Sequence, residues 1–232
     1  MQLPPALTQI DLLRAGFRDR ADAYPVILLA DAIRRARFDA DRPSLSAYAA
    51  TLRDMAPLRP HDPDVFIGRH EITFAEALRR CFGDRIHTNV TVAGDAERPY
   101  VPDVVYADPK TGTLLDIEID EPYSARTREP IHVFDDGSDR DSRRNRFFTN
   151  HGWSVVRFSE MQVTLSVYGC CRIVEQVVAM IECRPESLFY AGISTPPPHP
   201  RWTEEVAMQM ASHDSRRYCT RGTLAEHTRP RR

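Results

Sequence analysis

The chain has 232 residues, of which 31 are basic and 33 acidic, giving a formal net charge of −2. This composition is typical of a folded globular domain and excludes a disordered chain or a strongly basic tail protein. No apolar run is long enough to span a membrane, and the first residues lack the pattern of a secretory signal. The five cysteines form no CxxC pair. We therefore expect a cytoplasmic protein with reduced thiols and no membrane contact.

Lysine is almost absent from this sequence. Of the 31 basic residues, 30 are arginine, and Lys110 is the one lysine. A GC-rich coding sequence explains such a bias, but the chemical consequence holds whatever its cause. Mechanisms that need a lysine Schiff base or a P-loop lysine are improbable here, and no GxxxxGK[ST] string occurs.

The first 60 residues predict a helical segment. Helical patterns cover residues 24–38 and 44–55, the second with Ser44 as its N-cap. Three prolines in residues 56–64 predict a linker that ends this segment. We assign residues 1–60 to a helical N-terminal segment of unassigned role.

A different pattern follows and predicts an α/β core over residues 65–190. A helix over 71–82, ended by Gly83, comes before three strands over 85–93, 101–107 and 113–120. A turn at 108–112 joins the last two strands, and a polar loop covers 122–138. A basic helix over 139–150, a strand over 153–158 and one or two helices over 160–184 complete the core. This order predicts an α-β-β-β-α-β core with a mixed central sheet.

The remaining residues, 191–232, predict appended elements. A proline-rich hinge at 196–200 precedes a short helix over 201–213, and an Arg-rich tail follows.

Carboxylates gather on the strand over 113–120. Strand alternation places Asp116, Glu118 and Asp120 on one face, while Ile117 and Ile119 point into the core. Neighbouring carboxylates repel each other, and a hard divalent cation would remove that conflict. The alternative is an exposed acidic sheet face that binds no ligand.

Asp103 joins this group only in one register of the hairpin. The simplest five-residue turn places it opposite Ile117, on the wrong face, whereas a one-residue shift or a bulge places it opposite Glu118.

These motifs resemble the PD-(D/E)xK nuclease superfamily, whose fold is called restriction-endonuclease-like. Pro102-Asp103 is followed after about a dozen residues by Asp116-Ile117-Glu118-Ile119-Asp120. The later segment DRDSRRNRFFTNHGWSVVRF, residues 139–158, resembles the E-x-D branch that includes very-short-patch-repair endonucleases and related bacterial domains of unknown function. The resemblance covers about residues 70–185.

The resemblance implies a metal site and its ligands. Asp103 and Glu118 would bind Mg²⁺ or Mn²⁺, with the backbone carbonyl of Ile119 as a third ligand. Glu76 would be the acid of the preceding helix that orients a metal-bound water. Asp120 occupies the position of the superfamily lysine, so one metal ion, or a second one as well, would have to supply the missing positive charge.

Other residues of the same region could contact substrate. His132, in the loop, is a candidate general base or phosphate contact, although a plain loop histidine is the alternative. Arg140, Arg143 and Arg144 share a helix face by spacing, and the resemblance marks Arg144 and Asn145. Arginine forks bind phosphates, but a solvated face with internal Asp–Arg pairs is the alternative.

The sequence thus predicts a metal-dependent nuclease that hydrolyses nucleic acid, DNA more than RNA. Such an enzyme could be an effector subunit that needs a protein partner of a defence or mobile-element complex for targeting. The missing lysine and the net charge of −2 favour a second hypothesis, a catalytically inactive nuclease-fold subunit that binds nucleic acid or a partner protein.

Overall fold

A mixed five-stranded sheet organises the computed structural model of this protein. The structure describes residues 23–30, 59–60, 69–92, 99–134, 140–182 and 184–216. The strand order of the sheet is β2-β8-β7-β6-β4. Its strands are β2 (Val26–Leu28), β4 (Ile86–His87), β6 (Val104–Asp108), β7 (Thr113–Asp120) and β8 (Ser154–Ser159). The β7–β8 pair is parallel, and the other pairs are antiparallel, which confirms the predicted α/β class with a mixed sheet.

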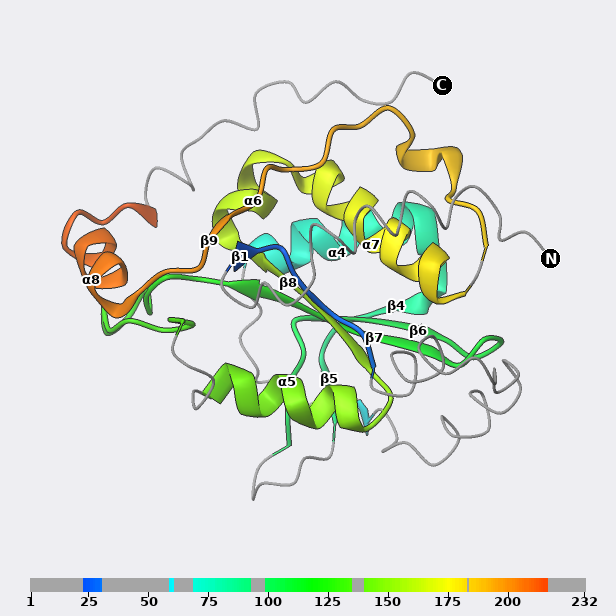
Figure 1. Ribbon diagram of the computed structural model, residues 1–232, viewed down its shortest axis with the longest axis horizontal. Helices are drawn as coiled ribbons and strands as arrows, with labels where there is room; N and C mark the ends of the chain where they lie inside the picture. The colour runs from blue at the N-terminus through cyan, green and yellow to red at the C-terminus, as the bar shows by residue number, and fades with distance from the viewer. Residues whose placement is uncertain are drawn as a thin grey trace, which may run out of the picture.

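Helices cover both faces of this sheet. Helices α4 (Arg69–Phe82), α6 (Glu160–Leu165) and α7 (Val167–Ile181) lie on one face, and α5 (Arg140–Asn150) lies on the other (Figure 1). The predicted helices over 71–82, 139–150 and 160–184 are therefore confirmed, the last as two helices. A capping box at Ser159 and Gln162 begins α6, and each side chain bonds the backbone N–H of the other residue.

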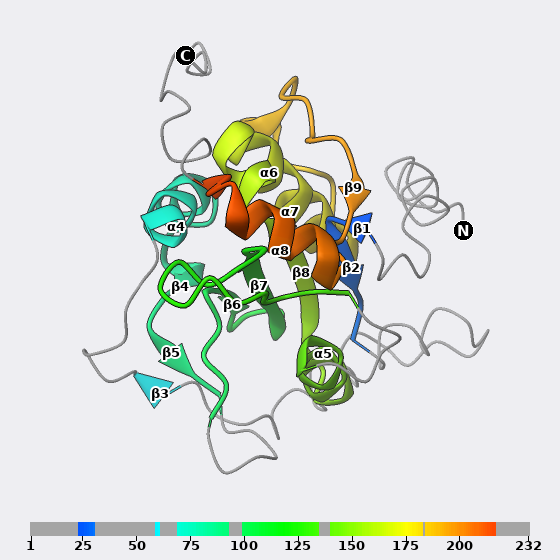
Figure 2. The same cartoon turned by 90° about the vertical axis from the view of Figure 1, so that its left-hand side faces the viewer.

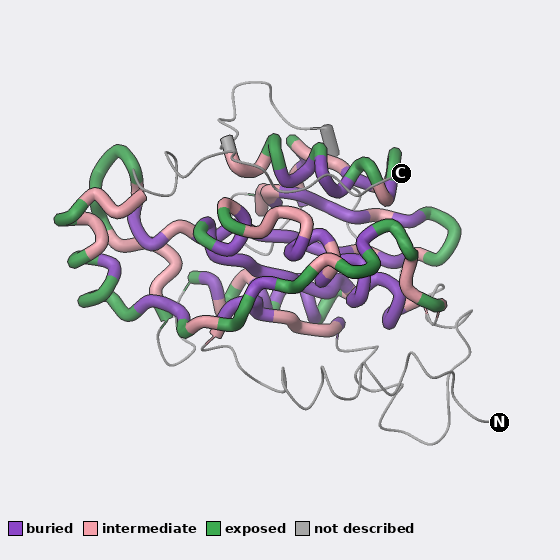
Figure 3. The backbone as a smooth tube through the Cα atoms, turned by 90° about the horizontal axis from the view of Figure 1, so that it is seen from above, coloured by how far each residue is buried: buried purple, intermediate pink, exposed green. Residues whose placement is uncertain are grey.

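Alternation along the strands divides the interior into two sides. Residues such as Val104, Ile117 and Val156 pack with α4 and α7 in the main apolar core. The residues between them face α5, where Val105 and Val155 pack with Phe148 in a smaller cluster. The buried backbone runs along the middle of the molecule (Figure 3). The α5 side also carries the acidic residues of β7, because they alternate with Ile117 and Ile119.

The prediction of a helix over residues 24–38 is wrong for residues 24–30, the part that the structure describes. Ala23–Tyr24 forms β1, and Val26–Leu28 forms β2, which pairs with β8 at the edge of the sheet. An unbroken apolar run, here Val26 to Ala30, suits a buried strand as well as a helix, so periodicity alone did not separate them. The predicted helix over 44–55 and the linker at 56–64 lie outside the described residues, except 59–60.

The strand expected over 85–93 is divided in two. After the short 3₁₀ helix η1 (Gly83–Arg85), β4 pairs with β6, whereas β5 (Val90–Thr91) pairs with β3 (Arg59–Pro60) in a separate small sheet. Asn89, between β4 and β5, has a φ of 58°, which breaks the extended conformation.

The segment after α7 returns to the other end of the sheet. A second 3₁₀ helix, η2 (Leu188–Tyr190), is followed by β9 (His199–Pro200), which pairs with β1. Helix α8 (Glu204–Ser212) follows the N-cap Thr203 and confirms the short helix predicted over 201–213, with a later start and an earlier end. Residues 217–232 of the predicted Arg-rich tail lie outside the described residues.

A buried hydrogen bond connects the N-terminal strands to the core. The hydroxyl of Tyr24 donates to Oδ2 of Asp120 at 2.8 Å, and the Tyr24 ring packs against Trp202. We predict that Tyr24→Phe lowers the free energy of unfolding by about 1–3 kcal/mol, because it leaves a buried carboxylate oxygen with one donor fewer. Urea denaturation measures the change.

Tyr168→Phe is the matched control for this prediction. The Tyr168 hydroxyl accepts from the exposed side chain of Arg80, so its loss is expected to cost less than about 1 kcal/mol. Equal losses in the two variants would contradict the prediction.

Candidate functional site

The three acids of β7 are all buried beneath α5. Asp116 and Asp120 are 0% exposed and Glu118 is 4% exposed, so they are not the solvated acidic face of the alternative interpretation. Burying three carboxylates within five residues needs compensating charges, because each loses its hydration. The neighbours that supply these charges divide the acids into two groups.

The hairpin register brings Asp103 to Glu118. Asp108 pairs with Thr113, so the turn is one residue shorter than the simplest expectation, and Val104 pairs with Ile117. Asp103 therefore lies opposite Glu118, and its N–H donates to Oε1 of Glu118 at 3.3 Å. The N–H of Ile119 in turn donates to Oδ2 of Asp103 at 2.7 Å. The first group thus consists of Asp103, Asp116 and Glu118.

Arg144 of α5 is the cation that the structure places against this first group. Its Nη2 lies 2.5 Å from Oε1 of Glu118 and 3.2 Å from Oδ1 of Asp116. The second oxygen of Asp116, Oδ2, is buried and has no hydrogen-bond partner. One guanidinium thus contacts two of the three carboxylates, and one oxygen of Asp116 is left without a donor.

The pKa values of Asp103 and Glu118 reflect their burial first and the neighbouring carboxylates second. Loss of hydration, together with the charges of Glu118 and Glu71, raises the pKa of Asp103 well above its ordinary value. Burial raises the pKa of Glu118 to about 8, and Asp116 adds to this rise while Arg144 opposes it. An added cation would lower the pKa of both carboxyl groups and favour their ionised forms, which is what a cation site requires.

The second group is centred on Arg157 of β8. Its Nε and Nη2 donate to the two oxygens of Asp120 at 3.0 and 2.6 Å, and Nη1 donates to Oδ1 of Asn145 at 3.1 Å. Nη2 also lies 3.1 Å from Oδ1 of Asp141. Arg157 is 0% exposed, and the pKa of Asp120 stays below its ordinary value because Arg157 outweighs the effect of burial.

His132 and Arg201 complete the second group. Nδ1 of His132 lies 3.0 Å from Oδ2 of Asp141 and 3.5 Å from Oδ1 of Asp120. Nη2 of Arg201 lies 3.2 Å from Oδ2 of Asp141. Burial lowers the pKa of His132, but the carboxylates of Asp120 and Asp141 outweigh it and raise that pKa to about 9. The imidazole is therefore positively charged at neutral pH.

The two groups differ in their fit to a divalent cation. Asp120, His132 and Asp141 have ligand atoms within 4.8 Å of one another. Their two carboxylates, however, already face the guanidinium groups of Arg157 and Arg201, so a metal would meet no excess of negative charge. Asp116 and Glu118 share the guanidinium of Arg144, and Asp103 lies beside them, so the three groups would carry an excess of negative charge once all are ionised, as they would be around a divalent cation.

Asp120, at the position that the resemblance assigns to a lysine, already has a positive charge beside it. The sequence led us to expect a metal ion to supply the positive charge near Asp120. In the structure the guanidinium of Arg157 supplies it from the neighbouring parallel strand. The expectation that Asp120 adds to a metal-rich centre is therefore not supported by its contacts.

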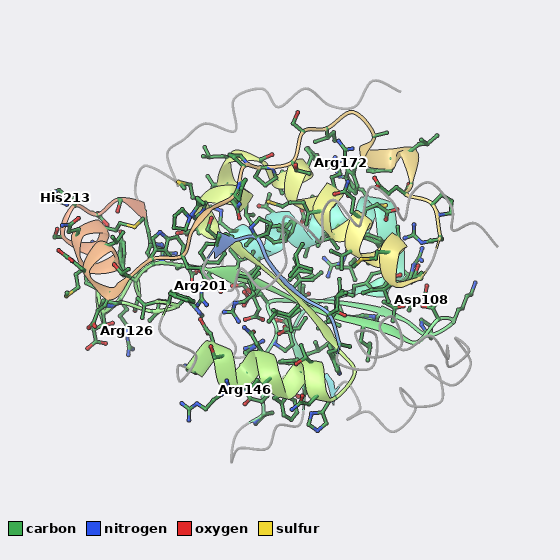
Figure 4. The ribbon with its side chains drawn as sticks, viewed as in Figure 1. Asp108, Arg126, Arg146, Arg172, Arg201 and His213 are labelled. Carbon is green, nitrogen blue, oxygen red and sulfur yellow. The ribbon has the colours of Figure 1, made fainter. Side chains whose placement is uncertain are left out.

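The predicted arginines of α5 point in different directions. Arg140 and Arg143 are exposed, whereas Arg144 and Asn145 are turned inward and hold Glu118 and Arg157. Arg146 is also exposed and lies on the outer side of α5 (Figure 4). The outer face of the helix, rather than Arg144 and Asn145, is thus the part available for contact with phosphates.

Glu71, which the sequence did not single out, is the acid of α4 that acts on Asp103. It lies on the same helix face as Phe74, Ala75 and Leu78, which pack into the core. The predicted Glu76 is exposed and lies about 140° away around the helix. Helical spacing from the apolar stripe was a sequence signal that could have favoured Glu71 over Glu76.

Arg157 and Asp141 were also missed as members of the site. A charged residue inside the otherwise apolar strand WSVVRF, next to an acidic strand, was the signal available for Arg157.

No family model, curated protein or solved structure matches this chain. No helix among the described residues is long and apolar enough to cross a membrane.

We predict that His132 titrates near pH 9 in the folded protein. Its folded pKa lies above the ordinary value of 6.5, so its contribution to stability is complete below pH 6.5 and is lost as the pH rises through about 9. Nuclear magnetic resonance of the imidazole Cε1–H measures this titration. Asp141→Asn should lower the pKa by at least about one unit, because it removes one of the two stabilising carboxylates.

The exposed His151 is the internal control in the same spectra, since its Nδ1 contacts the carbonyl of Phe147 rather than a carboxylate of the described residues. A titration of His132 near pH 6.5, unchanged by Asp141→Asn, would contradict the assignment.

Proposed function

We propose that this protein is a divalent-metal-dependent nuclease with a restriction-endonuclease-like core. The observation that carries the proposal is the first acidic group, in which Asp103 and Glu118 meet across two strands as buried carboxyl groups with raised pKa values. The order of strands and helices, the Asp103 register and the acid of α4 support the same proposal.

The residues present fit a bound Mg²⁺ or Mn²⁺. Asp103 and Glu118 would hold it, and the buried Oδ2 of Asp116, which has no hydrogen-bond partner, adds a further oxygen of the hard type these ions prefer. Ile119, whose carbonyl is the expected third ligand, lies in β7 between Glu118 and Asp120. When bound, the ion would lower the pKa of a water molecule and offset charge that develops on a phosphate.

The chain's own residues would bind and orient the substrate. Arg140 and Arg143, exposed on α5, would hold phosphates of the nucleic acid backbone through charge-assisted hydrogen bonds. His132 is charged at neutral pH, so it would donate a proton or a hydrogen bond to a phosphate oxygen rather than act as a base. Nδ1 is committed to Asp141, which leaves Nε2 as the donor.

One observation favours a second candidate function, a nuclease-fold subunit that binds nucleic acid or a partner protein without cleavage. Arg144 contacts Glu118 at 2.5 Å, so a cation ligand must compete with an internal guanidinium. If millimolar Mg²⁺ does not break that ion pair, the chain would keep its fold and the basic surface of α5 but would not cleave nucleic acid.

We predict that Asp103→Asn and Glu118→Gln weaken Mn²⁺ binding at least about tenfold, because each removes one charged ligand. Isothermal calorimetry measures the binding, and plasmid cleavage with Mg²⁺ or Mn²⁺ measures the activity, which should fall at least about 100-fold. Glu71→Gln should reduce cleavage more than Glu76→Gln does.

Asp84→Asn is the matched control, because Asp84 is an exposed carboxylate on η1, outside the site. Mn²⁺ binding by Glu118→Gln equal to that of the natural chain would overturn the metal assignment. Nucleic acid binding without Mn²⁺ binding would support the inactive subunit instead.

We predict that Arg140→Ala and Arg143→Ala weaken nucleic acid binding uniformly across sequences. Each loss of a phosphate contact should reduce the slope of log affinity against log salt by about one. Fluorescence anisotropy with a labelled 20-base-pair duplex, in the Asp103→Asn background, measures the slope. Arg79→Ala, an exposed arginine of α4, is the control, and an equal effect there would contradict a role of α5.

A further inference from the structure

Helix α8 lies over the end of the sheet where the parallel strands β7 and β8 finish. Figures 1 and 2 show the helix at this end from two directions. Asp120 and Ser159 are the last residues of the two strands, and Glu121 and Glu160 follow them directly. The carboxyl ends of parallel strands are where ligands commonly bind in α/β proteins. Helix α8 is therefore placed at the end of the sheet where such ligands bind.

The residues just before α8 are firmly attached to the core. His199 and Pro200 pair with β1, and Nε2 of His199 lies 2.6 Å from the hydroxyl of Ser159. Arg201 and Trp202 are 5% and 6% exposed, and Trp202 packs against the ring of Tyr24. These contacts fix the chain up to the N-cap Thr203.

Residues 203–216, which we name the latch, are attached differently. Of the residues of α8, only Ala207 is buried, while Val206 and Met208 are 42% and 50% exposed. A helix with so little buried apolar surface gains little stability from packing. Ala207 and Met210 pack with the apolar cluster of Tyr24, Val26 and Trp202, and the rest of the helix's retention depends on other contacts.

Ionic contacts at the far end of the latch supply this retention. Arg216 donates from Nε and Nη2 to the two oxygens of Glu160, both at 2.7 Å, and from Nη1 to the carbonyl of Tyr123 at 3.0 Å. Nη2 also reaches Oε1 of Glu121 at 3.4 Å. Asp214 forms an ion pair with Arg128 of the loop at 2.5 Å. A two-pronged arginine–carboxylate contact is strong but depends on both partners.

We propose that the latch opens as a unit about Thr203 and that Arg216 holds it closed. Opening uncovers Glu121, Glu160 and the loop from Glu121 to Phe134, which carries His132. The latch thus acts as an autoinhibitory cover over the end of the sheet that lies beside the candidate site. Its effect on cleavage rests on the proposed nuclease function, but the opening itself does not.

Hydrogen exchange of the full chain tests the opening. Arg216→Ala should accelerate exchange of the α8 amides by about tenfold or more, with the amides of β7 and β8 unchanged. Arg216→Lys should give an intermediate rate, because one ammonium group cannot reproduce the fork. Asp214→Asn is a milder second variant, should Arg216→Ala fail to fold, and should also accelerate exchange in α8.

Arg172→Ala is the control, since Arg172 bonds the carbonyl of Ile193, away from the latch (Figure 4). Unchanged α8 exchange in both latch variants, or equal acceleration in α8 and β7, would overturn the latch.

Cleavage by the same variants tests the autoinhibitory effect. With Mn²⁺ present, Arg216→Ala should cleave a plasmid several-fold faster than the natural chain. Faster α8 exchange without faster cleavage, in a chain that does cleave, would overturn autoinhibition. No cleavage by any variant, with α8 exchange accelerated, would overturn the nuclease proposal and leave the opening of the latch supported.

Discussion

The buried ion pair between Arg157 and Asp120 is the interaction on which the rest of the site depends. Both side chains are 0% exposed, and removing two charges from water is costly unless every donor and acceptor is satisfied. Their further partners come from distant segments, namely Tyr24 before β2, Asn145 of α5 and, beside Asp120, His132 of the loop. The ion pair therefore fixes how the N-terminal strands, α5 and the loop meet the sheet.

This pairing separates the acids of β7 by function. Asp120 is neutralised within the protein, so the negative charge that remains for a ligand lies with Asp103, Asp116 and Glu118. Arg201 does the same for Asp141 from the segment just before α8. Asp120, His132 and Asp141 have their ligand atoms close together, yet they form the poorer cation site. The charge that arginines leave uncompensated matters more for cation binding than the proximity of the ligand atoms.

Local patterns in the sequence predicted the elements that carry their own signal. The alternation of β7, the turn with Gly112 at a φ of 73°, and helices α4, α5 and α7 could all be derived from periodicity and turn residues. The strand at Val26–Leu28 could not, because a short apolar run adopts the structure of whatever it packs against. The partners of Asp120 were equally hidden, since pairing between residues 37 positions apart leaves no local pattern. The resemblance to nucleases selected Asp103 and Glu118, but only the register could show that they meet.

The most direct test of the charge argument is anomalous diffraction from crystals soaked in Mn²⁺. The account predicts a single strong peak between the carboxylates of Asp103 and Glu118, and none among Asp120, His132 and Asp141. A peak in the second group, or no peak at Asp103 and Glu118 at millimolar Mn²⁺, would contradict it.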